Sequence, residues 1–291
     1  MSQHRTLGEL ICITSALLCM SLTSPILAED LELTKEELIS RHIDAIGSKE
    51  ELAGVRFRVA QGTCIGRGRV FSLVGDDTGS LPGDAEFVTG PNATQFILKF
   101  NSEHYPIEGL LFDGKEIRLA VFEPPRHSGL AEADYRLGQF TDYASLWEEY
   151  IKRGLFGGVL NALWPLLSPE KNSGKMKSLK RTKIDGKELL VLRYHVRGTQ
   201  GAELFFEPET FHHVATRIRS AGGQSLAVGM SHSNFWTNLW EEFSDFIEVD
   251  GIHLPTRWTI RLELPQDTSR WEITFDRVKH TEGPELNRSA R

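Results

Sequence analysis

Apolar and polar residues alternate along much of this chain, which is the pattern of strands with one buried face. The alternation begins where Val55, Phe57 and Val59 are separated by Arg56 and Arg58. Further strand-like runs lie at about 68–74, 94–100, 110–112, 189–196, 204–206, 211–218, 240–249, 254–262 and 271–278. We therefore expect a mainly β fold.

Three Asp-Gly pairs lie between strand-like runs and predict how the strands connect. They are Asp113-Gly114, Asp185-Gly186 and Asp250-Gly251. Asp-Gly readily adopts the positive φ angles that a tight hairpin turn requires. A parallel sheet would need a helix between successive strands. The pairs therefore predict a meandering antiparallel sheet.

Two segments have helical rather than strand spacing. The first begins at Thr34 and ends near Gly47, and Thr34 with Glu37 has the spacing of a capping box. The second runs from about Tyr143 to Leu167 and is the most apolar part of the chain after residue 28. Three glycines inside it, at 154, 157 and 158, indicate a kink or break. We interpret this helical region as core that packs on the sheet. The alternative is a helix that lines a hydrophobic cavity or touches a membrane.

The remaining segments are polar and predict loops. Residues 75–84 and 220–233 are rich in glycine and small polar residues, and 168–183 is a lysine-rich stretch that we interpret as a solvated linker. We interpret the region at about 143–183, which begins with the helical segment, as a helical insertion. No change of composition marks a boundary, so residues 29–291 are expected to form one domain with a frayed tail from 282.

The amino terminus resembles a secretory signal peptide. A weakly positive start precedes an apolar stretch from Leu10 to about Leu22, and Ala28 ends a candidate cleavage site. An uncleaved anchor helix is the alternative. Cleavage would leave Cys64 as the single cysteine, so an exported protein of this sequence has no internal disulfide. We interpret Cys64 as a buried small residue in a strand, with a reactive thiol as the alternative.

Composition narrows the function classes. The 291 residues carry a formal net charge of −7, which argues against a general nucleic-acid binder. Apolar residues make up 40% of the chain, enough for a packed core. The sequence contains no apolar run long enough for a spanning helix, so we expect no transmembrane span after signal cleavage.

Tests for catalytic and metal motifs fail on specific residues. Gly66 and Gly68 resemble part of a nucleotide loop, but Phe71 occupies the position of the third glycine, and we expect no helix to follow. Ser225 is followed by Ala227 where a nucleophile elbow needs glycine. His212 and His213 are adjacent on a predicted strand and point to opposite faces. We therefore predict no catalytic residue, no cofactor and no metal site.

Two segments resemble hairpins of the periplasmic lipoprotein-carrier superfamily, which includes LolA-like, LolB-like and outer-membrane lipoprotein-sorting proteins. They are residues 243–255, with Asp250-Gly251 at the turn and Pro255 after it, and residues 204–211. The order of elements is similar over about 34–278. The resemblance implies a strongly curved antiparallel half-barrel sheet, whose mouth is closed by helices around an apolar cavity for acyl chains. It also implies that an arginine on an early strand holds the closed state, with Arg56, Arg58, Arg67 and Arg69 as candidates.

The expected function is therefore periplasmic, non-catalytic binding or carriage of a hydrophobic ligand, such as a lipid or a lipoprotein acyl chain. The cavity-lining candidates are Leu155, Phe156, Val159, Leu160, Leu163 and Trp164 from the helical region, and Trp240, Phe243, Phe246 and Trp258 from the aromatic-rich strands. Two alternatives stay open. One is an envelope interaction module with a solid core and a protein partner, and the other is an exported hydrolase using Asp245 or His253 in a polar pocket.

Overall fold

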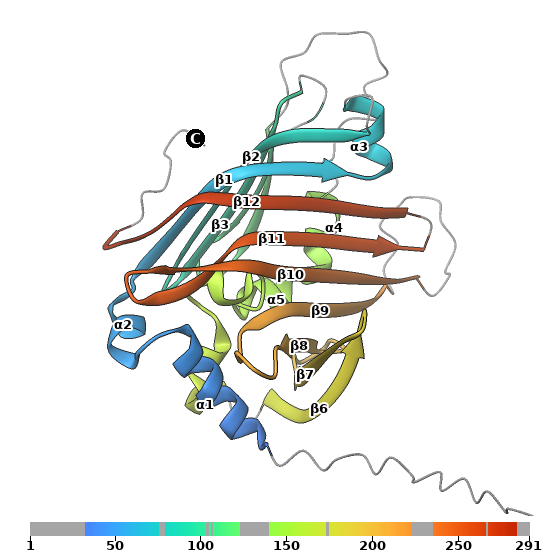
Figure 1. Cartoon of the computed structure of the whole chain (residues 1–291). Helices are drawn as coiled ribbons and strands as arrows, with labels where there is room; N and C mark the ends of the chain where they lie inside the picture. The colour runs from blue at the N-terminus through green and yellow to red at the C-terminus, as the bar shows by residue number, and fades with distance from the viewer. Residues whose placement is uncertain are drawn as a thin grey trace, which may run out of the picture. The chain divides into compact units, whose positions relative to one another are not determined.

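One continuous antiparallel sheet of twelve strands makes up most of the described structure (Figure 1). The computed structural model describes residues 33–75, 79–102, 105, 107–122, 140–172, 175–222, 235–265 and 267–283. Strand order in the sheet is β5-β4-β3-β2-β1-β12-β11-β10-β9-β8-β7-β6. The two edge strands, β5 and β6, are not paired with each other, so the sheet is open. This confirms the predicted half-barrel.

The strands and helices have the following bounds. The strands are β1 (Phe57–Arg67), β2 (Ser80–Gly90), β3 (Ala93–Phe100), β4 (Ile107–Phe112), β5 (Ile117–Phe122), β6 (Met176–Ile184), β7 (Lys187–Tyr194), β8 (Ala202–Phe206), β9 (His213–Gly222), β10 (Phe235–Val249), β11 (Ile252–Leu264) and β12 (Asp267–Thr281). The helices are α1 (Lys35–Ile46), α2 (Lys49–Gly54), α3 (Arg69–Val74), α4 (Thr141–Ala144), α5 (Glu148–Lys152) and α6 (Pro169–Asn172), with 3-10 turns η1 (Ser145–Trp147), η2 (Gly158–Leu160) and η3 (Pro165–Leu167).

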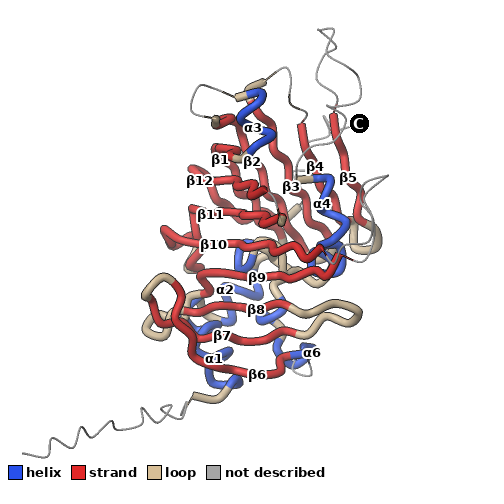
Figure 2. The backbone as a smooth tube through the Cα atoms, turned by 90° about the vertical axis from the view of Figure 1, so that its right-hand side faces the viewer, coloured by secondary structure: helices blue, strands red, loops and turns tan. Residues whose placement is uncertain are grey.

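The sheet bends around the short helices α4 and α5, which lie behind strands β9–β12 in Figure 1. Figure 2 shows the strands stacked in order along the molecule, with α1 at the end formed by β6 and β7. Alternation along each strand places one set of side chains inside this curve. On β10, for example, Leu239, Glu241 and Phe243 are buried, whereas Trp240 and Glu242 between them are only half-buried.

Two of the three Asp-Gly pairs form the predicted turns. At β10–β11, Asp250 and Gly251 have φ angles of 51° and 77°. At β6–β7, Asp185 and Gly186 have φ angles of 48° and 83°. These consecutive positive angles match the right-handed twist of the strands that they join. The third pair also joins two strands, but there Asp113 Oδ1 accepts hydrogen bonds from the backbone of the next residues.

The first helix begins where the sequence predicts. The Thr34 hydroxyl accepts a hydrogen bond from Glu37 N at 3.1 Å. The predicted capping box is only half formed, because the Glu37 carboxylate bonds Arg41 instead. A complete capping box occurs at the next helix, between Ser48 and Glu51.

Three other predictions of local structure are wrong. Residues 69–74 form helix α3 rather than a strand, since Phe71 packs its ring against the backbone of Gly66. A helix therefore does follow Gly68. The predicted loop at 75–84 already belongs to β2 from Ser80 onward. The predicted linker at 168–183 contains edge strand β6, whose lysines face solvent and discourage pairing with other chains.

Some predictions concern residues outside the described part of the chain. They include the signal peptide at 1–28, the candidate Ser225, most of the loop at 220–233 and most of the tail from 282.

Candidate functional site

The inside of the sheet is covered by residues 154–167, which we call the cover segment. It contains η2 and η3 but no continuous helix, because Gly154, Gly157 and Gly158 all have positive φ. The predicted helical region is therefore a series of short turns. At Gly158, a Cβ would lie 2.8 Å from the Nδ1 atom of His213. Only glycine therefore allows the segment to lie this close to the sheet.

The cover segment packs apolar side chains against the inner face of the sheet. Leu155, Phe156, Val159, Leu160 and Trp164 are at most 3% exposed, as predicted for a core-facing segment. Leu163 is only half-buried. The segment thus closes the interior with most of the side chains that the sequence singled out.

Aromatic rings fill the described interior beneath the cover. The centre of this aromatic cluster is Trp258 on β11, whose ring centroid lies 4.9 Å from Phe156, 5.1 Å from Phe87 and 5.2 Å from Phe96. Phe243 stacks on the same indole at 6.2 Å. The cluster therefore joins strands β2, β3, β10 and β11 to the cover segment.

Three polar side chains of the sheet hold the backbone of the cover segment. Arg58 on β1 donates to the carbonyl oxygen of Val159. The Thr89 hydroxyl on β2 donates to Leu160 O at 3.2 Å and accepts from Ala162 N at 3.0 Å. These contacts satisfy backbone groups that would otherwise be buried without partners.

Glu241 on β10 provides the third contact. Its Oε1 atom accepts a hydrogen bond from Gly157 N at 2.7 Å, and its side chain is fully buried. Burial raises the pKa of Glu241 to about 8, offset in part by the bond from Gly157 and by the nearby Trp258 indole, because an apolar environment disfavours the charged form. The carboxyl group is therefore mainly protonated at neutral pH.

Arg58 is the early-strand arginine that reaches the cover. It is 2% exposed, whereas Arg56, Arg67 and Arg69 are exposed. Burial lowers the pKa of Arg58 to about 10, so the guanidinium keeps its charge at neutral pH. Its Nε atom donates to His280 Nε2 at 3.2 Å.

His42 connects the cover segment to α1. The Trp164 indole donates to His42 Nε2 at 3.2 Å. The proton of the neutral ring is therefore on Nδ1, which donates to Phe211 O at 2.9 Å. Burial lowers the pKa of His42 to about 4, with smaller effects from the bond to Phe211 and from His212. A protonated ring could not accept the indole bond.

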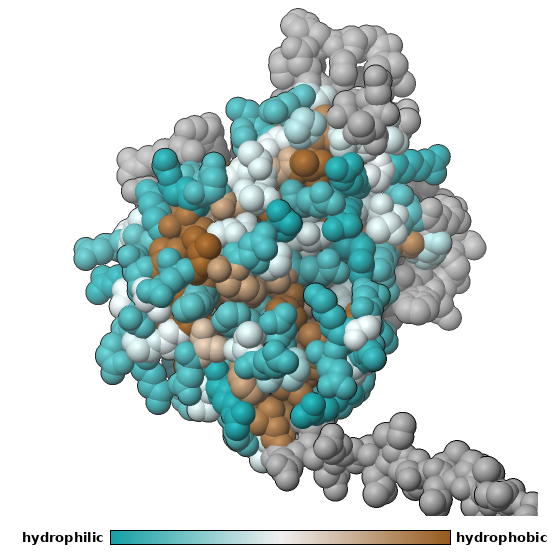
Figure 3. All heavy atoms as spheres, viewed as in Figure 1, coloured by the Kyte–Doolittle hydropathy of each residue, from teal (hydrophilic) through white to brown (hydrophobic). Residues whose placement is uncertain are grey.

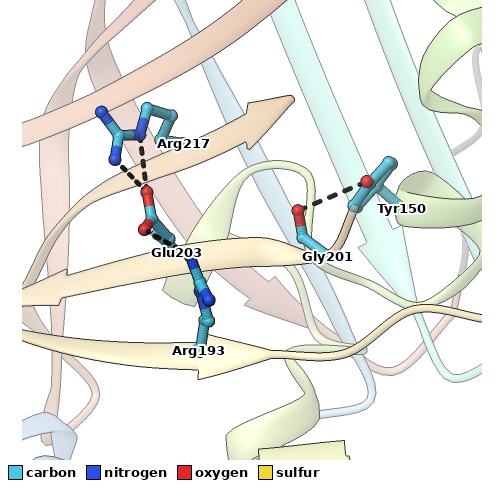
Figure 4. A network of polar contacts seen from close by, with 5 residues as sticks. All are labelled: Tyr150, Arg193, Gly201, Glu203 and Arg217. Carbon is cyan, nitrogen blue, oxygen red and sulfur yellow. Dashed lines mark hydrogen bonds and ion pairs between the residues drawn. The ribbon is translucent and has the colours of Figure 1, made fainter. Parts of the chain in front are cut away.

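A buried carboxylate and a tyrosine anchor the start of the helical region. Glu108 on β4 accepts hydrogen bonds from Phe140 N at 2.7 Å and from Thr141 N at 2.8 Å, at the beginning of α4. Tyr150 on α5 directs its hydroxyl to the carbonyl oxygen of Gly201 at 3.4 Å (Figure 4). The segment that leads into the cover is thus fixed to β4 and, at a distant part of the sheet, to Gly201 just before β8.

Trp240 and Phe246 lie apart from the aromatic interior, although the sequence placed them among the candidates. Strand alternation turns Trp240 to the outer face, where it stacks on Phe205 at 5.5 Å. Phe246 stacks on His212 at 4.4 Å. Only Phe243 and Trp258 of the four strand aromatics join the cover segment.

On the outer face, Trp240 packs against a small apolar cluster, and charged side chains surround this cluster. The buried members of the cluster are Leu189, Val191, Phe205 and Ala215. Arg217 places its guanidinium 4.9 Å from the Trp240 ring centroid. The same guanidinium donates to Glu203 through two nitrogens, and Arg193 approaches that carboxylate at 3.7 Å (Figure 4). Figure 3 shows a face on which hydrophilic side chains surround smaller hydrophobic patches. A pocket of about 390 Å³ on the outer face of β1–β3 is lined mainly by polar side chains, including Gln61 and Asp84, which do not suit an apolar ligand.

The residues named for a hydrolase lie at the surface rather than in a polar pocket. Asp245 is exposed and pairs with Arg257 at 3.3 Å, and His253 lies 3.9 Å from Glu248. Within the described ranges, no three His, Cys, Asp or Glu side chains are grouped as metal ligands. None of the helices in the described part of the chain is long and apolar enough to cross a membrane.

Sequence reasoning included Arg58 among four candidate arginines but missed the other polar contacts of the cover, although some signals were present. Glu241 occupies the inward phase between Leu239 and Phe243, and His42 lies within the apolar stripe of α1. A polar residue in an apolar phase indicates a buried group that needs a partner. Nothing in the sequence pattern identified Thr89.

Solved structures include three that cover most of this chain at low sequence identity. A LolA superfamily protein from Nitrosomonas europaea is 14% identical with a TM-score of 0.43, covering 87% of this chain and 96% of its own. A putative outer membrane lipoprotein-sorting protein domain from Vibrio parahaemolyticus is 10% identical with a TM-score of 0.37, covering 86% and 94%. A DUF1329 family protein from Desulfovibrio piger is 9% identical with a TM-score of 0.37, covering 86% and 94%.

No protein-family model matches the sequence, and neither does any curated protein sequence. The first two solved structures carry names from the superfamily that the hairpin motifs resemble.

Proposed function

We propose that this chain is a periplasmic, non-catalytic carrier that binds a lipid or a lipoprotein acyl chain beneath the cover segment. The observation that carries the proposal is how the cover is held. Its backbone meets the open sheet through side chains of Arg58, Thr89 and Glu241, and no strand pairing in the described structure fixes it there. Separation of these contacts would expose the aromatic interior without breaking the sheet.

The energies are compatible with ligand-driven opening. Burial of an acyl chain stabilises a complex by about 0.8 kcal/mol per methylene, so a chain of about twelve methylenes gives roughly 10 kcal/mol. Opening costs the hydrogen bonds of the cover, about 1 kcal/mol each, together with the apolar contacts of residues such as Phe156. A long chain is therefore needed to offset the loss, which favours lipids over small apolar molecules.

A second candidate is an envelope interaction module that binds a protein partner and no lipid. The observation in its favour is the dense packing of the described interior, where Phe87, Phe96 and Phe156 all contact Trp258. In this case, the cover would be a permanent part of the core and would not open.

Mass spectrometry of the organic extract distinguishes these candidates. The protein is expressed as the full chain, purified without detergent from the envelope of a bacterial host and extracted. A carrier yields lipid in stoichiometric amount and takes up a fluorescent fatty acid after delipidation. Neither bound lipid nor uptake would overturn the carrier proposal in favour of the interaction module.

Paired variants then test the role of the cover. Arg58→Met removes the donor to Val159, whereas Arg56→Met removes an exposed arginine two residues earlier. Faster uptake and release of the fluorescent fatty acid are expected for Arg58→Met alone. Identical kinetics in both variants and in the wild type would show that the cover does not gate the interior.

A further inference from the structure

The inner surface of the sheet beneath the glycines of the cover segment, which we call the floor, holds polar atoms without hydrogen-bond partners. Glu241 Oε2, His213 Nδ1 and Trp258 Nε1 are all buried, and none has a partner in the structure. Such atoms are rare in native interiors because each loses its bonds to water. Three of them in one region require a physical explanation.

Strand register places the three side chains on the same inner surface. Glu241 pairs with Thr216 on β9, and the Thr216 hydroxyl lies 3.1 Å from His213 Nε2. Glu241 also pairs with Ile260 on β11, two residues from Trp258, so Trp258 is its diagonal neighbour. The Trp258 indole N–H is directed toward the Glu241 carboxyl group and lowers its pKa, but the two groups do not reach the geometry of a hydrogen bond.

The cover segment lies directly on this floor. Gly157 N donates to Glu241 Oε1, and the space that a Cβ of Gly158 would occupy is bounded by His213 Nδ1 and by Phe243. When the cover lifts, Glu241 loses the hydrogen bond from Gly157, and the His213 ring is uncovered. A bound ligand can replace that bond and also meet the unpartnered atoms.

We propose that Glu241, His213 and Trp258 form a polar seat for the hydroxyl group of a neutral amphipathic lipid, whose alkyl chain enters the aromatic interior. This inference rests on the proposed carrier function and names its ligand class. A hydroxyl group can accept a hydrogen bond from the Trp258 indole and donate one to Glu241 or His213. It therefore satisfies both a donor and an acceptor of the seat.

Charged head groups fit the seat less well. An ammonium group has no acceptor for the Trp258 indole, and its burial in the aromatic interior would cost its hydration without an anionic partner. A carboxylate would have to lie beside the Glu241 carboxyl group without a compensating charge. An ether accepts but cannot donate, so it meets only half of the seat.

Four ligands with the same alkyl chain test this assignment. They are 1-decanol, decyl methyl ether, decanoate and decylamine, measured at pH 7 by displacement of a fluorescent fatty acid from the delipidated full-chain protein. Since one net hydrogen bond is worth about a factor of ten in affinity, 1-decanol should bind about tenfold more tightly than the ether. It should also bind more tightly than both charged ligands.

Variants then assign the preference to the seat. Glu241→Leu and, as a conservative second variant, Trp258→Phe should reduce the preference for 1-decanol over the ether several-fold. Thr237→Val is the matched control, since Thr237 Oγ1 is another buried unpartnered oxygen on β10, and its removal should leave the preference unchanged.

Equal affinity for all four ligands in the wild type, or an undiminished preference in both seat variants, would overturn the polar seat while leaving the carrier function intact. Failure of all four ligands to displace the fluorescent fatty acid would also overturn the seat. Absence of bound lipid and of any fatty-acid uptake would overturn both proposals together.

Discussion

Replacement of Glu241 by glutamine should remove a pH-dependent loss of stability. The carboxyl group is fully buried, and its pKa is raised from 4.5 to about 8, mainly by burial. Ionisation therefore places a charge in the interior without a cationic partner in contact. Glutamine keeps an oxygen that can accept the bond from Gly157, but it has no proton to lose.

The sign and size follow from the two pKa values. Because the folded pKa is raised, the stability from this carboxyl group is fully present below pH 4.5 and is lost as the pH rises through about 8. Each pH unit between the two values costs about 1.4 kcal/mol. Between about pH 5 and pH 8, the wild type should lose roughly 3 kcal/mol through this residue.

Urea unfolding followed by tryptophan fluorescence measures this effect. The difference in unfolding free energy between Glu241→Gln and the wild type should grow by about 3 kcal/mol in favour of the variant from pH 5 to pH 8. Because both proteins contain the other titrating groups, such as His42, the contributions of these groups cancel in this difference. Glu170→Gln, at an exposed carboxylate on α6, should follow the wild type at both pH values. A difference for Glu241→Gln that does not change with pH would refute the reasoning.

Three other substitutions test single contacts. His42→Gln should reduce the acid instability: burial lowers the pKa of His42 from 6.5 to about 4, so stability present above pH 6.5 falls by about 3 kcal/mol as the pH approaches 4. Urea titrations at both pH values check this, and equal losses in variant and wild type would contradict it. Gly158→Ala should lower the unfolding free energy by more than about 1 kcal/mol through its positive φ and its close contacts. Gly54→Ala, with nothing within 4 Å of the new Cβ, should not lower it in the same thermal scan. Arg217→Met should cost about 2 kcal/mol by leaving Glu203 without its two bonds, and an unchanged melting temperature would count against that contact.

Local chemistry is what made the fold predictable. Asp250-Gly251 and Asp185-Gly186 adopt the predicted positive φ angles, and the alternation around Phe243 places it inside the sheet. Consecutive strands pair within β1–β5 and within β6–β12, but the pairing of β1 with β12 that joins these two groups is not a hairpin and could not be read from local residues. By contrast, residues 69–74 were assigned to a strand because a short apolar run fits either helix or strand.

The candidate site was predicted mainly in its apolar part, and Arg58 was only one of four arginines that the family resemblance implied. Leu155, Phe156 and Trp164 are recognisable because a cluster of large apolar residues has to be buried somewhere. Trp240 shows the limit of that reasoning, since the same residue type on the next position of the strand faces outward. Burial depends on which neighbour covers a side chain, and the sequence does not state the neighbour.

The sequence by itself determined the antiparallel hairpins, the apolar character of the cover segment and the inward alternation of the strands, because these depend on residues close together along the chain. Only the tertiary structure decided that Arg58, Thr89 and Glu241 hold the cover, and that Glu241, His213 and Trp258 meet beneath it. These contacts of the cover join residues up to 101 positions apart. A buried hydrogen bond depends on the distance between two atoms in space, and that distance is set by how the sheet bends.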